Sequence, residues 1–238
     1  MKKFLAMMLA LVMALSLVAC GEQGDSQKGD DSASGDKVVK IGVFEPTSGQ
    51  NGGGGKKEIL GMQYANKMIP TVTIGGEEYK VELVYADNAS SNDKAPTAAQ
   101  TLISQGVSVV LGSYGSGVSI AAGDTFSAAQ VPAIGVTCTN PQVTSDCDAY
   151  FRICFLDPFQ GTVHANYAYK EMGATKAYTL AMLGSDYDQG LVYYFTEAFK
   201  ALGGEVVSED FPEGNANFVS YINNAKAANA GVIFSPVS

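Results

Sequence analysis

Residues 107–136, VSVVLGSYGSGVSIAAGDTFSAAQVPAIGV, contain the pattern that decides the fold. The apolar run Val107–Leu111 predicts a buried strand, Ser116–Ala129 predicts a helix, and Ala133–Val136 predicts a second short strand. Two strands joined by a crossover helix pair in parallel, and such crossovers cover the faces of a sheet with helices. The stretch therefore predicts an α/β fold.

The same alternation continues on both sides of this stretch. Two successive α/β lobes fit it better than one sheet, with the changeover near residues 137–160. We expect an N-terminal lobe at 37–155 and a partial C-terminal lobe at 156–238. The second lobe is expected to be partial because the chain stops directly after a strand, which suggests a fragment or a truncated reading frame. The other expected strands are Val38–Phe44, Tyr79–Tyr85, Tyr150–Phe155, Ala177–Leu183, Glu205–Glu209 and Val232–Phe234, and the other expected helices are Lys57–Met68, Asp93–Gln105, Pro158–Met172, Leu191–Leu202 and Asn217–Ala228.

The composition limits the class of protein. Of the 238 residues, 46% are hydrophobic and 16% are charged, and 24 acidic side chains outnumber 15 basic ones. The net charge of −9 argues against a nucleic-acid partner, which would need a basic surface. Apart from the N-terminus, no apolar run approaches the ~20 residues of a membrane span, so most of the chain is expected to be soluble.

The N-terminus has the pattern of an export signal. Two lysines precede the apolar run Phe4–Val18, and Leu17–Gly21 (LVACG) resembles a bacterial lipobox. We expect residues 1–19 to be a lipoprotein signal peptide and Cys20 to carry the lipid; the alternative is a plain signal peptide or a buried helix followed by a chance cysteine. Residues 20–36 contain almost nothing apolar and are expected to form a flexible tether to the outer face of the cell membrane.

Motifs for nucleotide binding and catalysis are incomplete. Gly52–Gly55 and Lys56 suggest a phosphate loop, but Gln50 and Lys57 stand where a Walker A motif needs Gly and Ser or Thr. We expect a flexible loop entering a helix there. His164 is the only histidine and no GxSxG motif is present. The sequence therefore predicts no enzyme activity, no cofactor and no metal site.

Cys138, Cys147 and Cys154 remain once Cys20 is assigned to the lipid. Their spacing contains no CxxC pair of the kind found in zinc sites. One interpretation is a disulfide, with Cys138 and Cys147 the closest pair in sequence, and one free thiol. The other is three reduced thiols, and the spacing does not decide between them.

Two loops that follow neighbouring strands are rich in hydroxyl groups. Gly112–Gly117 leads from a strand into a helix, the place where open α/β sheets bind ligands. A helix N-terminus offers free N–H groups and the positive end of the helix dipole, and Ser116 adds a hydroxyl, which together suit a carboxylate. The alternative is an ordinary Ser N-cap. Because Thr137 and Thr139 follow the next strand, the two strand ends together predict a binding site.

At these residues the chain closely resembles the leucine/isoleucine/valine-binding protein family, the type I solute-binding receptors of ABC importers. The similarity covers essentially Val38–Ser238, and it implies a fold of two Rossmann-like lobes. The motifs that carry it are Thr47-Ser48-Gly49, Gly112–Ser116, Thr137-x-Thr139-Asn140-Pro141-x-x-Thr144, Phe151-Arg152-x-Cys154-Phe155-x-Asp157-x-x-Gln160-Gly161, Asp186-Tyr187-x-x-Gly190 and Asn217-Phe218-x-x-x-Ile222.

The resemblance implies a site for a small zwitterion. Ser116 would bind the ligand carboxylate through its hydroxyl and N–H, and Thr139 would support it. The carbonyl of Thr137 would accept a hydrogen bond from the ligand ammonium, and Tyr187 would close over the ligand from the other lobe. The expected ligand-binding residues are Tyr114, Gly115, Ser116, Thr137, Thr139 and Tyr187.

The chain departs from the family pattern in three ways. An aromatic residue of the first loop is replaced by glycine at about Gly54, so we expect a wider or more mobile side-chain pocket. Ser90 and Gly115 stand where some members have a disulfide. The acidic residue that usually pairs with the ligand ammonium lies beyond Ser238.

The resemblance therefore implies a lipid-anchored, extracytoplasmic solute-binding protein that captures a branched-chain or related amino acid by hinge closure and delivers it to ABC permease subunits. Amides, urea-like compounds and aromatic acids are alternative ligands. A sensory ectodomain that reports a ligand to a signalling partner is the alternative function, and an extracellular enzyme is a third. Nucleic acid is not an expected partner.

Overall fold

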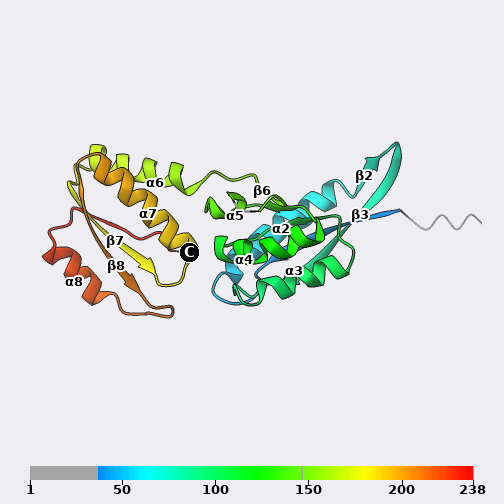
Figure 1. Cartoon of the computed structure of the whole chain (residues 1–238), viewed down its shortest axis with the longest axis horizontal. Coiled ribbons are helices and arrows are strands. Elements are labelled where there is room, and N and C mark those ends of the chain that lie inside the picture. Colours follow the sequence, from blue (N-terminus) through cyan, green and yellow to red (C-terminus); the bar gives the residue numbers. More distant parts are fainter. Residues whose placement is uncertain (1–36, 146, 238) are drawn as a thin grey trace, which may run out of the picture. The chain divides into compact units, whose positions relative to one another are not determined.

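The computed structural model describes residues 37–145 and 147–237. The expected signal peptide, lipidated Cys20 and tether lie outside these residues. The described chain forms two sheets with helices on their faces (Figure 1), so the predicted α/β fold is confirmed. Within this part of the chain, no helix combines the length and apolar character needed to cross a membrane.

The first sheet is a doubly wound sheet of six strands in the order β2-β3-β1-β4-β5-β6. All neighbours are parallel except β2 and β3, which form an antiparallel hairpin through Gly75 and Gly76. Its elements are β1 (Val38–Glu45), α2 (Gly52–Met68), β2 (Thr71–Ile74), β3 (Glu77–Asp87), α3 (Ala95–Ser104), β4 (Val109–Leu111), α4 (Ser116–Ala129), β5 (Ala133–Gly135), α5 (Gln142–Ser145) and β6 (Tyr150–Arg152).

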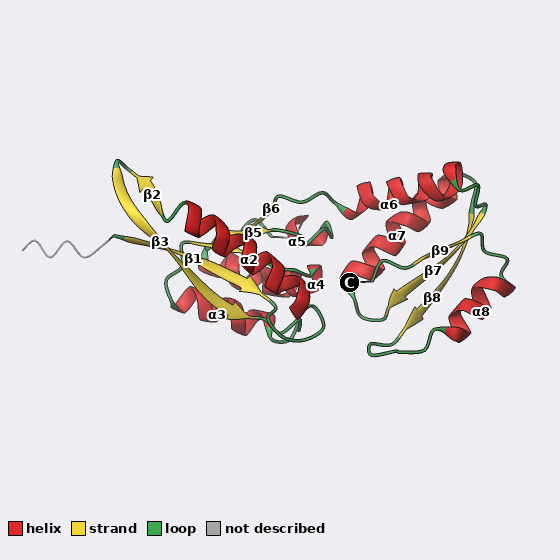
Figure 2. Cartoon of the chain, turned by 180° about the vertical axis from the view of Figure 1, so that it is seen from behind, coloured by secondary structure: helices red, strands yellow, loops and turns green. Residues whose placement is uncertain are grey.

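The second sheet has three parallel strands in the order β8-β7-β9, with α6 and α7 on one face and α8 on the other (Figure 2). Successive residues of β7 point to opposite faces, so Ala177 packs with Phe195 and Phe199 while Tyr178 and Leu180 pack on the α8 side. Its elements are α6 (Asp157–Asn166), a π-helical turn η1 (Tyr167–Glu171), β7 (Lys176–Met182), α7 (Asp186–Ala201), β8 (Glu205–Phe211), α8 (Val219–Ala227) and β9 (Val232–Phe234).

The core of the first sheet is apolar, with aromatic rings at its centre. Phe44, Leu102, Val110 and Phe126 are each 0% exposed, and the rings of Phe44 and Phe126 meet edge to face with centroids 5.5 Å apart. Each such side chain contributes roughly 1.5–3 kcal/mol when it is fully buried. This packing fixes the central strands, and with them the loops that follow the strands.

Both sheets have a point where the chain reverses its direction of winding. In the first sheet β1 lies between β3 and β4, so the chain moves to one side of β1 and then to the other. In the second sheet β7 lies between β8 and β9. Loops that follow strands at such a switch point part from each other, and the crevice between them is where α/β proteins bind ligands.

The prediction of a flexible loop at Gly52–Gly55 is wrong, because α2 begins at Gly52 rather than at Lys57. Close packing explains this helical glycine run. A Cβ on Gly55 would lie 2.1 Å from the carbonyl oxygen of Pro46, and a Cβ on Gly54 would lie 2.6 Å from the ring of Tyr114. The glycines let the first turn of α2 approach the neighbouring backbone and ring, and this tertiary contact outweighs their low helix propensity.

Smaller differences occur at strand and helix ends. The strand expected at Tyr150–Phe155 ends at Arg152, and the helix expected to run to Met172 changes to a π-helical turn at Tyr167. The short strand β2 and the four-residue helix α5 were not expected from the sequence. Both are too short to show a reliable hydrophobic period.

Candidate functional site

A cavity of about 220 Å³ lies where the loops after β4 and β5 meet the start of α7. All six residues expected to bind the ligand line this cavity, so the fold brings together positions that are up to 73 residues apart, from Tyr114 to Tyr187. The full lining consists of Tyr114, Gly115, Ser116, Thr137, Thr139, Phe155, Gln160, Tyr187 and Val237.

Ser116 is the first residue of α4 and is only 2% exposed. Gly115, with φ +110°, is the N-cap, so Ser116 does not have the N-cap role of the alternative interpretation. Its Oγ accepts a hydrogen bond from the N–H of Asn140 at 3.2 Å. Because that bond uses a lone pair of the oxygen, the hydroxyl proton of Ser116 remains available to an acceptor in the cavity. The free N–H groups of the first turn of α4 lie beside it.

The loop after β5 is fixed by Arg152 of β6. The guanidinium donates to the carbonyl oxygens of Cys138 and Asn140 at 2.9 Å each, to that of Pro141 at 3.2 Å, and to Oγ1 of Thr144 at 2.7 Å. These bonds hold the turn that carries Thr137 and Thr139, the two hydroxyl residues on this side of the cavity.

Asp157, at the start of α6, is a candidate site residue to which the sequence assigned no role. Its N–H donates to the carbonyl oxygen of Thr139 at 3.0 Å, and the side chain is 0% exposed behind the cavity wall. Oδ1 accepts a long hydrogen bond from Gln160 at 3.4 Å. Among the described residues, Oδ2 of Asp157 and Oγ1 of Thr139 are buried without a hydrogen-bond partner.

Burial raises the pKa of Asp157 above its ordinary value, while the side-chain hydroxyl of Thr139 beside the carboxyl group, the charge of Arg152 and the side-chain amide of Gln160 act in the opposite direction. A buried carboxylate without full compensation is costly and gains from a cation placed beside it. The sequence signal was its position in the quoted motif, but only the burial and the unpartnered oxygen indicate a binding role.

Tyr187, in the first turn of α7, lines the cavity from the side of the second sheet. Its ring is half-buried, and burial together with the charges of Asp157 and Asp188 raises the pKa of its hydroxyl to about 12. The phenol is therefore neutral at physiological pH and can donate a hydrogen bond.

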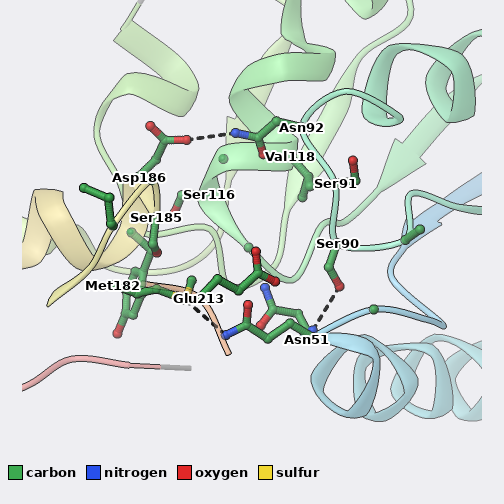
Figure 3. A pocket seen from close by; sticks show the side chains of 18 residues that line it. Asn51, Ser90, Ser91, Asn92, Ser116, Val118, Met182, Ser185, Asp186 and Glu213 are labelled. Atoms are coloured by element: carbon green, nitrogen blue, oxygen red, sulfur yellow. Dashed lines mark hydrogen bonds between the residues drawn. The ribbon is translucent and has the colours of Figure 1, made fainter. Parts of the chain in front are cut away.

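Asp186, the residue before Tyr187, connects the two sheets. Its Oδ2 accepts from Nδ2 of Asn92 at 3.2 Å (Figure 3). Its carbonyl oxygen accepts from Nδ2 of Asn140 at 2.8 Å. A Cβ on Gly117 would lie 2.6 Å from Oδ2 of Asp186, so this close approach depends on glycine at that position. These contacts border a second, more polar cavity of about 390 Å³, drawn in Figure 3.

The three cysteines Cys138, Cys147 and Cys154 are free thiols in this structure, and Cys138 is buried. The interpretation with a Cys138–Cys147 disulfide therefore does not match the structure. Cys147 instead contacts Oγ of Ser127 at 3.2 Å. In the described part of the chain, no group of three or more His, Cys, Asp and Glu side chains is arranged to hold a metal ion.

Comparison with known families identifies the fold. The family model described as "Periplasmic binding protein" matches residues 38–236. The chain belongs to this family. The resemblance to leucine/isoleucine/valine-binding proteins is confirmed, and this periplasmic binding protein has the type I fold predicted from its sequence.

Curated relatives of this periplasmic binding protein include an amino acid binding protein of Pseudomonas aeruginosa, 31% identical over 200 residues, and Leu/Ile/Val-binding protein homolog 3 of Brucella melitensis, 30% identical over 203 residues. In both cases the match covers 82% of this chain and 53% of the relative. The chain thus spans about half the length of the curated relatives it matches.

Solved structures give the same result. The leucine-binding protein LivK of Thermotoga maritima is 33% identical with a TM-score of 0.77, over 82% of this chain and 55% of that one. LivJ of Streptococcus pneumoniae, in complex with isoleucine, is 30% identical with a TM-score of 0.73, over 83% and 56%. A solute-binding protein of Rhodopseudomonas palustris, in complex with 3,4-dihydroxybenzoic acid, is 26% identical with a TM-score of 0.73, over 84% and 55%.

Proposed function

We propose that this periplasmic binding protein captures an α-amino acid outside the cytoplasm and delivers it to the permease of an ABC importer. The observation that carries the proposal is the pairing of two complementary groups at one cavity. Donors for a carboxylate lie at the start of α4, and a buried acid with an unpartnered oxygen lies behind the adjoining wall. An α-amino acid presents one partner for each of these groups.

The carboxylate end of the ligand is assigned to Ser116. Its hydroxyl and the N–H groups of the first turn of α4 donate to the carboxylate, and the positive end of the helix dipole adds to the attraction. Thr139 supports this end, because its buried hydroxyl lines the cavity.

The ammonium end is assigned to Asp157 and to the carbonyl of Thr137. Asp157 supplies a negative charge next to this end of the cavity. An ammonium bound over Thr139 and Gln160 lies next to the negative charge of Asp157 behind the cavity wall. This charge pairing is the feature that distinguishes an amino acid from other carboxylates.

Closure over the ligand is assigned to Tyr187 and Asp186. Tyr187 brings a donor hydroxyl to the cavity from α7, and the bonds of Asp186 to Asn92 and Asn140 hold α7 against the first sheet. A ligand that contacts both sides favours the closed arrangement by its differential affinity for that state.

Aromatic acids are the alternative ligand class, because a structural relative is in complex with 3,4-dihydroxybenzoic acid. Such an acid has a carboxylate but no ammonium, and it would leave Asp157 unpaired. The buried Asp157 therefore favours an amino acid, and a branched-chain side chain is the first choice because LivJ is in complex with isoleucine.

Thermal unfolding of residues 21–238 with isoleucine, leucine, other amino acids and 3,4-dihydroxybenzoate tests the proposal. A ligand at 100 times its Kd adds ~2.7 kcal/mol to stability, which raises the Tm by roughly 5–10 °C for a chain of this size. A shift with amino acids alone supports the proposal. A shift with the aromatic acid alone contradicts it, and so does a sharp transition that no compound shifts.

Replacing Ser116 with alanine is expected to weaken isoleucine binding by about 10- to 100-fold, because a hydrogen bond to a charged group contributes ~1.5–3 kcal/mol. Calorimetric titration measures this loss, and Ser108→Ala, at an exposed position before β4, is the matched control. Equal affinities of Ser116→Ala and the control would remove Ser116 from the site.

Attachment to the outer face of the membrane through lipidated Cys20 is the second part of the proposal. It rests on the lipobox pattern Leu17–Gly21. Cys20→Ser is expected to release the protein from the membrane fraction of the expressing bacterium, since two or more acyl chains are what make such anchoring stable. A Cys20→Ser variant that still sediments with membranes would overturn the lipid assignment.

A further inference from the structure

Glu45, the last residue of β1, is a buried acid next to the ligand cavity. Its side chain is 1% exposed, and Oε2 accepts a hydrogen bond from the N–H of Tyr114 at 2.7 Å. The loop after β4 passes directly over it, because a Cβ on Gly112 would lie 2.7 Å from Oε1 of Glu45. Oε1 itself has no hydrogen-bond partner among the described residues.

Glu58, on α2, completes the arrangement from the other side. Its Oε1 accepts the hydroxyl proton of Thr137, and its Oε2 is buried without a donor from the described chain. The side chain of Glu58 lies close enough to act on Glu45 both by hydrogen bonding and by its charge. Two carboxylates cannot hydrogen-bond, since both are acceptors only, but a carboxyl group and a carboxylate can.

A single proton between the two carboxyl groups would give a hydrogen-bond partner to both unpartnered oxygens, Oε1 of Glu45 and Oε2 of Glu58. Burial, followed by the hydrogen bond and the charge of Glu58, raises the pKa of Glu45 to about 10, against the opposing N–H of Tyr114. Tyr150 of β6 is a further titratable group near Glu45, and burial raises its pKa well above its ordinary value, so its phenol stays neutral. Glu45 is therefore protonated at neutral pH and can donate a hydrogen bond to Glu58.

We propose that Glu45 and Glu58 share one proton and that this pair positions the walls of the ligand cavity. The pair joins four segments: β1, α2, the backbone of Tyr114 and the hydroxyl of Thr137. Tyr114 and Thr137 line the cavity, whereas neither glutamate does. The two acids are therefore positioning residues, and loss of the shared proton places two like charges side by side beneath the Tyr114 loop.

Glu45→Gln, Glu45→Ala and the control Glu82→Gln, at an exposed position on β3, test the shared proton without any ligand. Because the folded protein holds the proton more tightly than the unfolded chain, the stability contributed by Glu45 falls as pH rises from about 4.5 to about 10. The Tm of the wild type is therefore expected to fall relative to that of Glu45→Gln between pH 7 and pH 10, while Glu82→Gln follows the wild type. Parallel Tm curves for the wild type and Glu45→Gln would overturn the shared proton.

Isoleucine titrations at pH 8 test the positioning role, which rests on the proposed function. Glu45→Ala is expected to weaken binding about 10-fold or more. Glu45→Gln is expected to keep the affinity of the wild type, because its amide oxygen accepts from the N–H of Tyr114 and its amide nitrogen donates to Glu58 in place of the proton. Wild-type affinity of Glu45→Ala would overturn this role. Another amino acid that shifts the Tm replaces isoleucine in these titrations. If the wild type binds no amino acid, the proposed function fails, and the near-UV circular dichroism of Tyr114 tests the positioning role instead. That signal, taken as the difference from Tyr114→Phe, is expected to be weakened in Glu45→Ala and retained in Glu45→Gln; an unchanged signal in both overturns the positioning.

Discussion

Replacement of Asp157 with asparagine is expected to weaken isoleucine binding by about 30-fold or more and to raise the Tm of the free protein at pH 7. Truncating one partner of a buried charge pair costs about 2–5 kcal/mol of binding free energy, which sets the size of the first effect. Calorimetry measures the affinity, and thermal unfolding in the absence of ligand measures the stability.

The second effect follows from the raised pKa of Asp157. Because burial makes the folded protein hold this proton more tightly than the unfolded chain does, the stability that the group contributes falls as pH rises above its ordinary value of 3.8. The asparagine variant has no such penalty. Its advantage in Tm is therefore expected to be present at pH 7 and to vanish below about pH 3, where the carboxyl group is protonated in both states.

Asp188→Asn is the matched control, because Asp188 is 2% exposed and burial also raises its pKa. Its two oxygens, however, accept from Oγ of Ser185 at 2.9 Å and from the N–H of Met182 at 3.0 Å. Asparagine at 188 replaces one of these acceptors with a donor and is expected to lower the Tm. If Asp157→Asn binds isoleucine as tightly as the wild type, the ammonium is bound elsewhere.

Gly55→Ala and Gly53→Ala are expected to change stability in opposite directions, although both lie in the first turn of α2. A Cβ on Gly55 would meet the carbonyl oxygen of Pro46 at 2.1 Å, and this backbone atom cannot rotate away. Overpacking of this kind costs about 3 kcal/mol. A Cβ on Gly53 meets nothing within 4 Å, so alanine there is expected to add about 0.5–1 kcal/mol through its higher helix propensity.

Urea unfolding of the two variants measures both changes in the free energy of unfolding. Residues 52–55 lie beside the Tyr114 wall of the cavity, so the same experiment tests whether this part of the site is helical. Small and equal effects of the two substitutions would mean that the glycine run is a mobile loop, as the sequence alone suggested.

Most of the strands were accessible from the sequence because the buried parallel strands are continuous apolar runs with turn residues between them. The helix Ser116–Ala129 and the strand Val232–Phe234 have the expected bounds. The convergence of Ser116, Thr139 and Tyr187 on one cavity was predicted by the resemblance together with the rule that ligands bind at the carboxyl ends of strands.

The parts that escaped sequence reasoning depend on contacts between distant residues. Local propensity at Gly52–Gly55 favours a loop, and only the approach of Pro46 and Tyr114 makes a helix there the better structure. Asp157 has an ordinary position for an acidic residue at the start of a helix, and its unpartnered oxygen is a result of burial. The Glu45–Glu58 pair joins residues that have no periodic relation to each other.

The hydrogen bonds of Arg152 have a consequence for the entropy of ligand binding. Four of them fix the loop that carries Thr137 and Thr139, and Ser116 is a short, buried side chain at a helix end. These groups have already lost their conformational freedom during folding, so binding a carboxylate restricts them little further. All ligands with a carboxylate therefore lose little binding free energy to the ordering of the protein groups that bind that carboxylate. The differences in affinity among them are set by what their other end meets.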